Sequence, residues 1–306
     1  MSQKSVEIAK YIGAPIDSNL KVGKILAEIC DNDTALPGEE VKTLVPDDAN
    51  GVDNIYTSDA NGTITAVKVV MGAPTLLTFS HLQTKLEYVL VSEVLDSPDQ
   101  SALGRRKGSI TRRLDKIETK RVLDMLLAIT LQEVVQATGE DIYAVIMKLM
   151  RKVENYADNY VLLCGTDCWA KIDDYEKDNA DNFQYRVSVN ELLVEKKITK
   201  IKVIGNIKLD GGSDVPVLAA NKMIIVGRDS QLAQGKPVVM VRRLISAIAG
   251  QAGAEVDVEE RALYVAETPT PFYNGTTLAH GYGIFGYESV IQAVLNYRAI
   301  SWATFA

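Results

Sequence analysis

The stretch KLEYVLVSEVLDSPDQSALGRRKGSITRRLDKIETKRVLDMLLAI, Lys85–Ile129, runs from a predicted strand into a predicted helix. Leu86–Val91 is rich in Val and Leu, which favours a strand. Residues 97 to about 131 are predicted to be mainly helical. Pro98 falls in the first turn, where its missing N–H leaves no hydrogen bond unmade.

The helix should bury one apolar stripe and expose a basic surface. Residues recurring at helical spacing are Leu114, Ile117, Met125 and Ala128. Basic residues lie around them: Arg112, Arg113, Lys116 and Lys120. Because Gly104 and Gly108 lower helix propensity, we expect the continuous helix to begin only near Ser109.

Residues 1–41, upstream of this stretch, are predicted to form an arm. One short pattern has amphipathic helical spacing, Val22, Ile25, Leu26 and Ile29. The rest is turn-rich, and the segment holds too little apolar periodicity to build a core alone. It is either a frayed terminus or an arm that becomes ordered on a neighbouring subunit.

Residues 42–86 are predicted to be an extended β region. Candidate strands are Val41–Val45, Thr63–Val70 and Thr75–Phe79. Between the first two lies VPDDANGVDNIYTSDANG, with two Asn-Gly dipeptides that favour hairpin turns. This long polar segment between two strands has no obvious core of its own. Loops of that length are usually functional or disordered.

Residues 136–255 alternate helices and strands, which indicates an α/β or α+β block. Thr138 to Asp141 matches a capping box with Asp at the reciprocal position. The helix that follows carries one apolar face, Ile142, Val145, Ile146, Leu149 and Val153. A buried strand at Tyr160–Cys164 and a short helix at Asp167–Tyr175 come next. Further strands are predicted at 200–204, 215–218, 223–226 and 237–242.

The last part of the chain returns to strands at 261–266 and 286–295, separated by a loop with Pro269, Pro271 and several glycines. The closing strand should pair near the helix and strands that precede the α/β block. This order does not indicate two independent domains.

Composition narrows the functional classes. The 306 residues are 47% hydrophobic with a net charge of −7, and no apolar run approaches the ~20 residues of a membrane span. A protein that grips DNA by charge alone is usually basic. With two histidines far apart, His81 and His280, a histidine-based triad or multi-histidine metal site is strongly constrained. Three cysteines make no disulfide framework.

Two glycine motifs resemble phosphate loops without meeting their requirements. Residues 281–286 spell GxGxxG, but too little chain follows for a βαβ unit, so we expect a flexible glycine loop. Gly227 to Gly235-Lys236 has seven intervening residues instead of four, and Pro237 stands where Ser or Thr must hold magnesium.

Other side-chain clusters have structural explanations that we prefer. Cys164 and Cys168 flank a strand-to-helix turn, which could lower the Cys168 pKa, although packed small residues are the favoured interpretation. The basic run 105–107 with Arg112 and Arg113 could touch nucleic acid, but a solvated face or ion pairs with a neighbouring subunit is favoured. No calcium-loop spacing is found among the acidic residues. We predict no catalytic residue, cofactor site or metal site.

The order of these segments resembles the major capsid proteins of tailed bacteriophages over residues 40 to 302. The acidic Glu93–Ser97 stretch leading into a long helix is similar to that family's spine region. GEDIYAVIMKLMRKVENYADNYVLLCGTDCWAKIDDY (139–175) resembles its helix, buried strand and short helix. GYESVIQAVLNYRAIS (286–301) is similar to its closing strand, and Gly227-Arg228-Asp229 departs from the family's Gly-Asp turn.

The resemblance implies the α+β Hong Kong 97-like capsid fold. It would place an N-terminal arm at 1–41, an E-loop hairpin at 42–86, a P domain with the spine helix at 87–135 and 256–306, and an A domain at 136–255. It further implies hexamers and pentamers enclosing double-stranded DNA in a virion, after synthesis in the host cytoplasm.

Implied partners are portal, scaffolding and cement proteins and weak non-specific contact with packaged DNA, with no membrane. Two alternatives stay open. One is a shell protein of an encapsulin nanocompartment, which has the same fold. The other is a soluble α+β enzyme that uses carboxylates such as Asp173 or Asp210.

Overall fold

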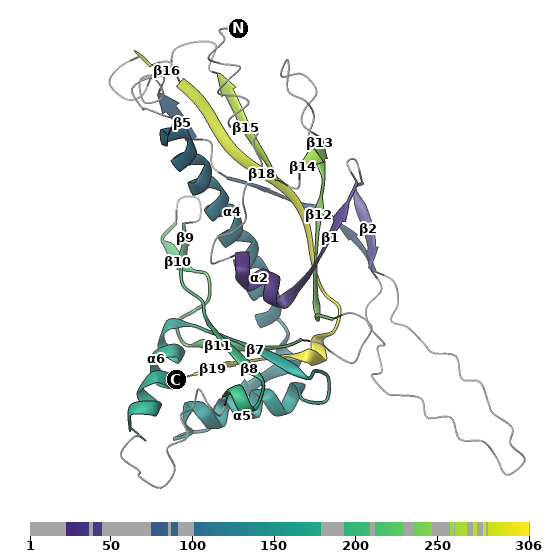
Figure 1. Ribbon diagram of the computed structural model, residues 1–306, viewed down its shortest axis with the longest axis vertical. Helices are drawn as coiled ribbons and strands as arrows, with labels where there is room; N and C mark the ends of the chain where they lie inside the picture. Colours follow the sequence, from purple (N-terminus) through teal and green to yellow (C-terminus); the bar gives the residue numbers. More distant parts are fainter. Residues whose placement is uncertain are drawn as a thin grey trace, which may run out of the picture.

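The structure is a computed structural model that describes residues 23–36, 39–44, 75–84, 87–90, 101–178, 193–208, 212–228, 235–246, 258–259, 261–267, 272–273, 278–279 and 281–305. The molecule is elongated (Figure 1). A sheet with two helices forms one end, and a long helix and a long strand extend from it towards the other.

The long helix α4 (Ser101–Leu127) and the long strand β18 (Gly281–Val294) lie side by side. They approach closely at Gly286, where a Cβ atom would lie 2.6 Å from Ile110 Cγ2 and 2.9 Å from Leu114 Cδ1. The Gly286 backbone is also fixed by Thr84, whose N–H donates to its carbonyl and whose hydroxyl accepts from its N–H, both at 2.8 Å. Only glycine lets the helix approach the strand this closely.

The expectation of a flexible glycine loop at 281–286 is wrong, because these residues begin β18. They pair with β15 (Arg261–Glu267) on one side and β5 (Glu87–Leu90) on the other. The pairing of β18 with β5 joins residues nearly 200 positions apart. The local glycine content therefore gave no indication of this pairing. The GxGxxG spelling is therefore strand and not a phosphate loop.

A six-stranded sheet forms around β18. It has the order β1-β12-β18-β15, and β4 and β5 also pair with β18. The remaining members are β1 (Cys30–Ala35), β4 (Ser80–Gln83) and β12 (Val238–Arg243). Pairing of β1 with β12 is parallel, and that of β12 with β18 is antiparallel.

A five-stranded sheet makes up the other end of the molecule, in the order β6-β19-β11-β7-β8. Its strands are β6 (Glu133–Val135), β7 (Asn159–Cys164), β8 (Ile198–Lys202), β11 (Lys222–Arg228) and β19 (Ile300–Thr304). Alternate side chains face opposite sides. On one face Leu162, Met223 and Ile225 pack against α5 (Ile142–Val153) and α6 (Thr166–Asp178).

The opposite face of this sheet joins the core beneath α4. Leu163, Ile224 and Trp302 share a buried cluster with residues of α4, β12 and β18. The short helix α2 (Gly23–Ile29) enters the same cluster through Ile25, Leu26 and Ile29, which are at most 4% exposed. The helical pattern predicted for α2 is confirmed.

The expectation that the whole of 1–41 lies outside the core is wrong for residues 23–35. The three apolar side chains of α2 are too few to make a core, but they complete one built by α4 and β12. β1 then extends the six-stranded sheet. Residues 1–22 lie outside the described residues.

Small ladders complete the described structure. They are β2 (Val41–Leu44) with β3 (Thr75–Thr78), β9 (Asn206–Lys208) with β10 (Asp214–Pro216), β13 (Ile245–Ser246) with β14 (Val258–Glu259), and β16 (Phe272–Tyr273) with β17 (Leu278–Ala279). Two 3-10 turns, Thr130–Gln132 and Tyr297–Ala299, precede β6 and β19.

Most predicted elements are confirmed within a few residues. The buried face of α5, the buried strand β7 and the helix α6 are present, as are β2, β3, β5, β8, β10, β11, β12 and β15. The strand predicted at Thr63–Val70, Pro98 and the Glu93–Ser97 stretch lie outside the described residues.

Two helix starts differ from the prediction. α4 begins at Ser101 and not near Ser109, because Gly104 and Gly108 lie in a helix whose later turns are held by tertiary packing. The N-cap of α5 is Asp141 and not Thr138: the Asp141 carboxylate accepts from the Ala144 N–H at 2.7 Å. Glu140 instead binds the Ala137 N–H.

Each of the two sheets combines strands from more than one of the predicted ranges. β6 and β19, assigned to the P domain, belong to the five-stranded sheet, and β12, assigned to the A domain, belongs to the six-stranded one. Gly227 and Arg228 lie in β11 and not in a turn. Sheet partners far apart in sequence decide these memberships.

The contact at Gly286 gives a direct test. We expect Gly286→Ala to lower the free energy of unfolding by about 1–3 kcal/mol, because Ile110 and Leu114 are fully buried and cannot move aside without strain. The matched change Gly108→Ala, in α4 but with nothing within 4 Å of the new Cβ, should raise it by about 1 kcal/mol. Urea unfolding followed by circular dichroism measures both. Equal effects would contradict the packing argument.

Candidate contact surfaces

The ladder β2–β3 presents an apolar face to solvent. Within the described part of the chain these strands pair only with each other. Because Thr43 lies opposite Leu76, and Val41 lies two residues from Thr43, Val41 and Leu76 share one face. Val41 is 41% and Leu76 63% exposed. We call these two residues the stem patch.

The other face of the ladder rests on the body of the subunit. Leu77 packs against the small buried cluster of Phe79, Val239 and Ile291. Two-stranded ladders are marginally stable alone in water. One face is therefore anchored to its own chain, and the stem patch is left for a partner.

Polar contacts hold the base of this ladder. Lys42 of β2 forms an ion pair with Asp33 of β1, and the hydrogen bond from Lys42 lowers the Asp33 pKa. Arg243 donates to the Glu39 carbonyl at 3.0 Å and to the Ser289 hydroxyl at 3.2 Å. The direction in which the ladder leaves the body is thus set by charged contacts to β1, β12 and β18.

A second exposed apolar pair lies at the edge of the five-stranded sheet. Leu131 is 77% and Val135 79% exposed. β6 is an edge strand, and the Lys152 amino group donates to Glu133 O of this strand at 2.8 Å and to Leu131 O of the preceding turn at 3.2 Å. Such a lysine blocks strand addition. The β6-edge patch, Leu131 and Val135, is therefore suited to side-chain contact.

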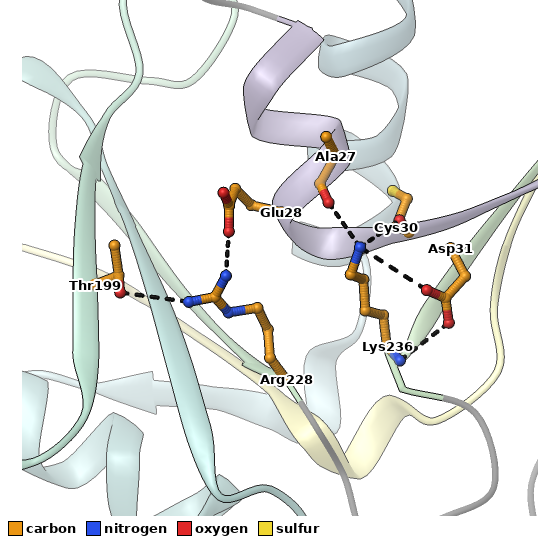
Figure 2. A network of polar contacts seen from close by, with 7 residues as sticks. All are labelled: Ala27, Glu28, Cys30, Asp31, Thr199, Arg228 and Lys236. Atoms are coloured by element: carbon orange, nitrogen blue, oxygen red, sulfur yellow. Dashed lines mark hydrogen bonds and ion pairs between the residues drawn. The ribbon is translucent and has the colours of Figure 1, made fainter.

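A network of polar contacts anchors the N-terminal segment to the body (Figure 2). Arg228, at the end of β11, forms an ion pair with Glu28 of α2. Lys236, just before β12, donates to Ala27 O at 2.6 Å and Cys30 O at 3.2 Å. Its ammonium lies 3.8 Å from an Asp31 carboxylate oxygen.

This network joins α2 to both sheets. Lys236 binds the Ala27 carbonyl in the last turn of α2, where a cation also interacts favourably with the helix dipole, and the Cys30 carbonyl at the start of β1. Arg228 extends the connection to Thr199 of β8 at 3.4 Å. The anchoring role of Arg228 and Lys236 was not predicted from the sequence, because their partners lie about 200 residues away.

A buried ion pair links α4 to β12. Arg242 donates to both carboxylate oxygens of Glu118, at 3.0 and 2.9 Å, and Glu118 is fully buried. Gln292 of β18 donates to the Glu118 carbonyl at 3.2 Å. The three elements therefore share one polar contact within the apolar core.

The cysteines are structural. Cys30, Cys164 and Cys168 are free and buried. Burial raises the pKa of the Cys30 and Cys168 thiols to about 12, and it raises that of Cys164 further. The suggestion that the helix start lowers the Cys168 pKa is wrong, because desolvation dominates. The favoured interpretation, packed small residues, agrees with this burial.

The histidines do not assemble a catalytic group among the described residues. His81 Nδ1 lies 2.8 Å from the Ser289 hydroxyl and 2.6 Å from the Tyr287 hydroxyl. Ser289 is fully buried in the middle of β18, so its hydroxyl is closed to a substrate. This contact ties β4 to β18. His280 lies outside the described residues.

The carboxylates and glycines singled out in the sequence are scattered. Asp173 lies 3.6 Å from Lys200 in an ion pair, and Asp210 lies outside the described residues. Across the described ranges, no group of three or more potential metal ligands comes together. Gly227 is packed in β11, where a Cβ would lie 2.3 Å from that of Ala157. Arg112 and Arg113 are exposed on α4.

None of the helices in the described part is both long and apolar enough to cross a membrane.

Comparison with known proteins identifies the fold. The sequence matches no protein-family model and no curated protein. Solved structures match over almost the whole chain. A chain from Microbacterium phage Oxtober96 is 11% identical with a TM-score of 0.56, covering 99% of this chain and 98% of that one.

Two further structures belong to particles. The capsid structure of Cyanophage P-SCSP1u gives a TM-score of 0.52 at 11% identity, covering 90% of this chain and 86% of that one. The virus-like particle from Pyrococcus furiosus gives 0.52 at 14% identity, covering 99% and 100%. The chain therefore has the Hong Kong 97-like capsid fold that the sequence resemblance predicted.

The anchoring network predicts a local effect. We expect Lys236→Met to lower the free energy of unfolding by about 1–2 kcal/mol, because the Ala27 and Cys30 carbonyls lose their donor. Residues 23–35 should exchange amide hydrogens faster, as measured by mass spectrometry. The control Lys171→Met, at an exposed position of α6, should change neither the free energy of unfolding nor the amide exchange of residues 23–35. Unaltered exchange in the Lys236 variant would contradict the anchoring role.

Thiol burial predicts both reactivity and pH dependence. The three cysteines should resist Ellman's reagent at pH 8 in the folded protein and react after unfolding in urea. Burial raises the pKa of the Cys30 and Cys168 thiols in the folded state above the ordinary value of 9.0. The contribution of these protonated thiols to the free energy of unfolding is therefore complete below pH 9.0 and is lost as the pH rises towards about 12. The Cys30→Ala and Cys168→Ala double variant should lose less stability over this range. Fast labelling of the folded protein would show that these thiols are accessible.

Proposed function

We propose that this chain is the major capsid protein of a tailed bacteriophage. Copies would assemble as hexamers and pentamers into an icosahedral shell around double-stranded DNA. The observation that carries the proposal is the agreement in fold over almost the whole chain with a phage capsid structure and a virus-like particle. No enzymatic activity is part of the proposal.

Assembly would bury apolar surfaces that are exposed on the isolated monomer. The stem patch and the β6-edge patch expose large apolar side chains on different elements. Closed symmetric assemblies bury such patches against further copies. Subunit contacts then add stability to each protomer.

The proposed parts keep their predicted ranges: an arm at 1–41, an E-loop at 42–86, a P domain at 87–135 and 256–306, and an A domain at 136–255. The ladder β2–β3 would be the stem of the E-loop, and α4 the spine helix. Portal, scaffolding and cement proteins are proposed as further partners. The proposed location is the virion, after synthesis in the host cytoplasm.

Electron microscopy of the purified protein tests assembly. We expect closed shells of megadalton mass, with light scattering as an independent measure. A stable monomer of 33.5 kDa or a small oligomer would overturn the proposal. The contents of the shells distinguish a phage capsid from an encapsulin nanocompartment. DNA packaged in shells from infected cells would support the phage capsid, and an enclosed enzyme would support the nanocompartment.

The stem patch gives a variant test. We expect Leu76→Asp to reduce the yield of shells at least tenfold, because it places a charge where a neighbouring subunit would bury an apolar side chain. The change should leave the circular dichroism spectrum unaltered, since Leu76 is exposed. Thr138→Asp, at an exposed turn before α5, is the matched control and should assemble normally. Normal shells from the Leu76 variant would exclude this patch as a subunit contact.

A further inference from the structure

The outer edge of the five-stranded sheet presents backbone groups that a further strand can bind. β6 is the end strand of this sheet, and its strand partner among the described residues is β19. The Gln132 carbonyl accepts from the Ser301 hydroxyl of β19 at 2.8 Å, so this carbonyl points into the sheet. Because backbone groups alternate in direction along a strand, Glu133 and Val135 direct their N–H and C=O groups outward.

The segment along this edge has the composition of strands that associate. Residues 131–136 are LQEVVQ, with no proline, no glycine and one charged residue. Exposed segments of this length and composition pair readily with further strands. Leu131 and Val135 are 77% and 79% exposed. A second strand laid along the edge would therefore cover apolar surface that water now contacts.

Two copies of this edge are complementary to each other. In an antiparallel pair centred on Val134, Glu133 of one copy lies opposite Val135 of the other, and Val135 opposite Glu133. Both outward-facing residues then exchange their N–H and C=O groups with the second copy. A two-fold axis generates such a contact from identical surfaces. The edge therefore fits a second copy of this chain.

The Lys152 side chain occupies this edge in the single subunit. Its ammonium donates to the Glu133 carbonyl at 2.8 Å and to the Leu131 carbonyl at 3.2 Å. Antiparallel pairing needs the Glu133 carbonyl for the Val135 N–H of the second copy. Pairing would also enclose two Lys152 ammonium groups close to the two-fold axis, where each loses water and meets a like charge.

We propose that the β6 edge is a self-pairing site, and that Lys152 is the residue that keeps two copies from joining through it. Loss of the Lys152 charge opens the edge, and the five-stranded sheets of two copies then join into one continuous sheet. A charged side chain at an edge strand prevents such association in other proteins. The inference concerns the single subunit and does not rest on the proposed function.

Disulfide cross-linking reports pairing at this edge. The reporter variant combines Glu133→Cys and Val135→Cys, two exposed positions that lie opposite each other in the paired register. Paired strands bring their Cα atoms within the separation that a disulfide spans. The native cysteines are buried. Full-length protein, in the fraction that size-exclusion chromatography shows to be unassembled, is oxidised with glutathione, and covalent dimer is measured on a non-reducing gel.

We expect Lys152→Met, added to the reporter, to raise the fraction of covalent dimer about fivefold or more, because the edge loses its blocking charge. Lys152→Arg keeps the charge and the donors, and Lys171→Met removes one charge at an exposed position of α6. Both controls should stay within about twofold of the reporter alone. An unchanged dimer fraction with Lys152→Met, or an equal rise with Lys171→Met, would overturn the inference.

Circular dichroism checks that each variant is folded. Should Lys152→Met fail to fold, Lys152→Gln takes its place, since it also removes the charge but keeps a polar side chain at this exposed position. Electron microscopy separates this inference from the proposed function. Shells from the unaltered protein together with an unchanged dimer fraction sink the inference alone. A raised dimer fraction without shells from the unaltered protein sinks the proposed function alone.

Discussion

The close approach of α4 to β18 at Gly286 is the contact on which the rest of the architecture depends. With no side chain at Gly286, Ile110 and Leu114 lie directly on the strand, and the two longest described elements pack against each other. β18 is then the common partner of β4, β5, β12 and β15. Four strands from three separate parts of the chain are in this way positioned by a single strand. A larger residue at this point would separate helix from sheet and open the core between them.

The polar contacts around this core explain how the N-terminal segment becomes part of the body. Glu118 and Arg242 join α4 to β12 within the core, where removal of either partner would strand a buried charge. Arg228 and Lys236 then hold α2 and β1 against both sheets. Because α2 contributes only three apolar side chains, these charged contacts have an important share in keeping it in place. Residues 23–35 therefore belong to the body, and the ladder β2–β3 follows β1 in the chain.

The surfaces that remain differ in chemistry. The stem patch and the β6-edge patch are apolar, and Lys152 closes the edge of β6 to strand addition, so both patches suit subunit contacts made by side chains. Between residues 111 and 128 the solvent side of α4 carries five basic residues and Asp124, whereas Asp115 and Glu118 are buried.

The sequence by itself determined the elements whose signals are local: the apolar face of α5, the buried strand β7, the helical spacing in α4 and α2, and the order of segments that resembles a capsid subunit. Only the tertiary structure decided that 281–286 is strand, that α4 begins at Ser101, that β12 joins the six-stranded sheet and β19 the five-stranded one, and that α2 is buried. It also revealed the stem patch, the anchoring by Arg228 and Lys236, and the inward side of Asp115 and Glu118. Strand pairing, burial and ion pairs join residues up to about 200 positions apart, and no local periodicity encodes which distant segment will supply the partner.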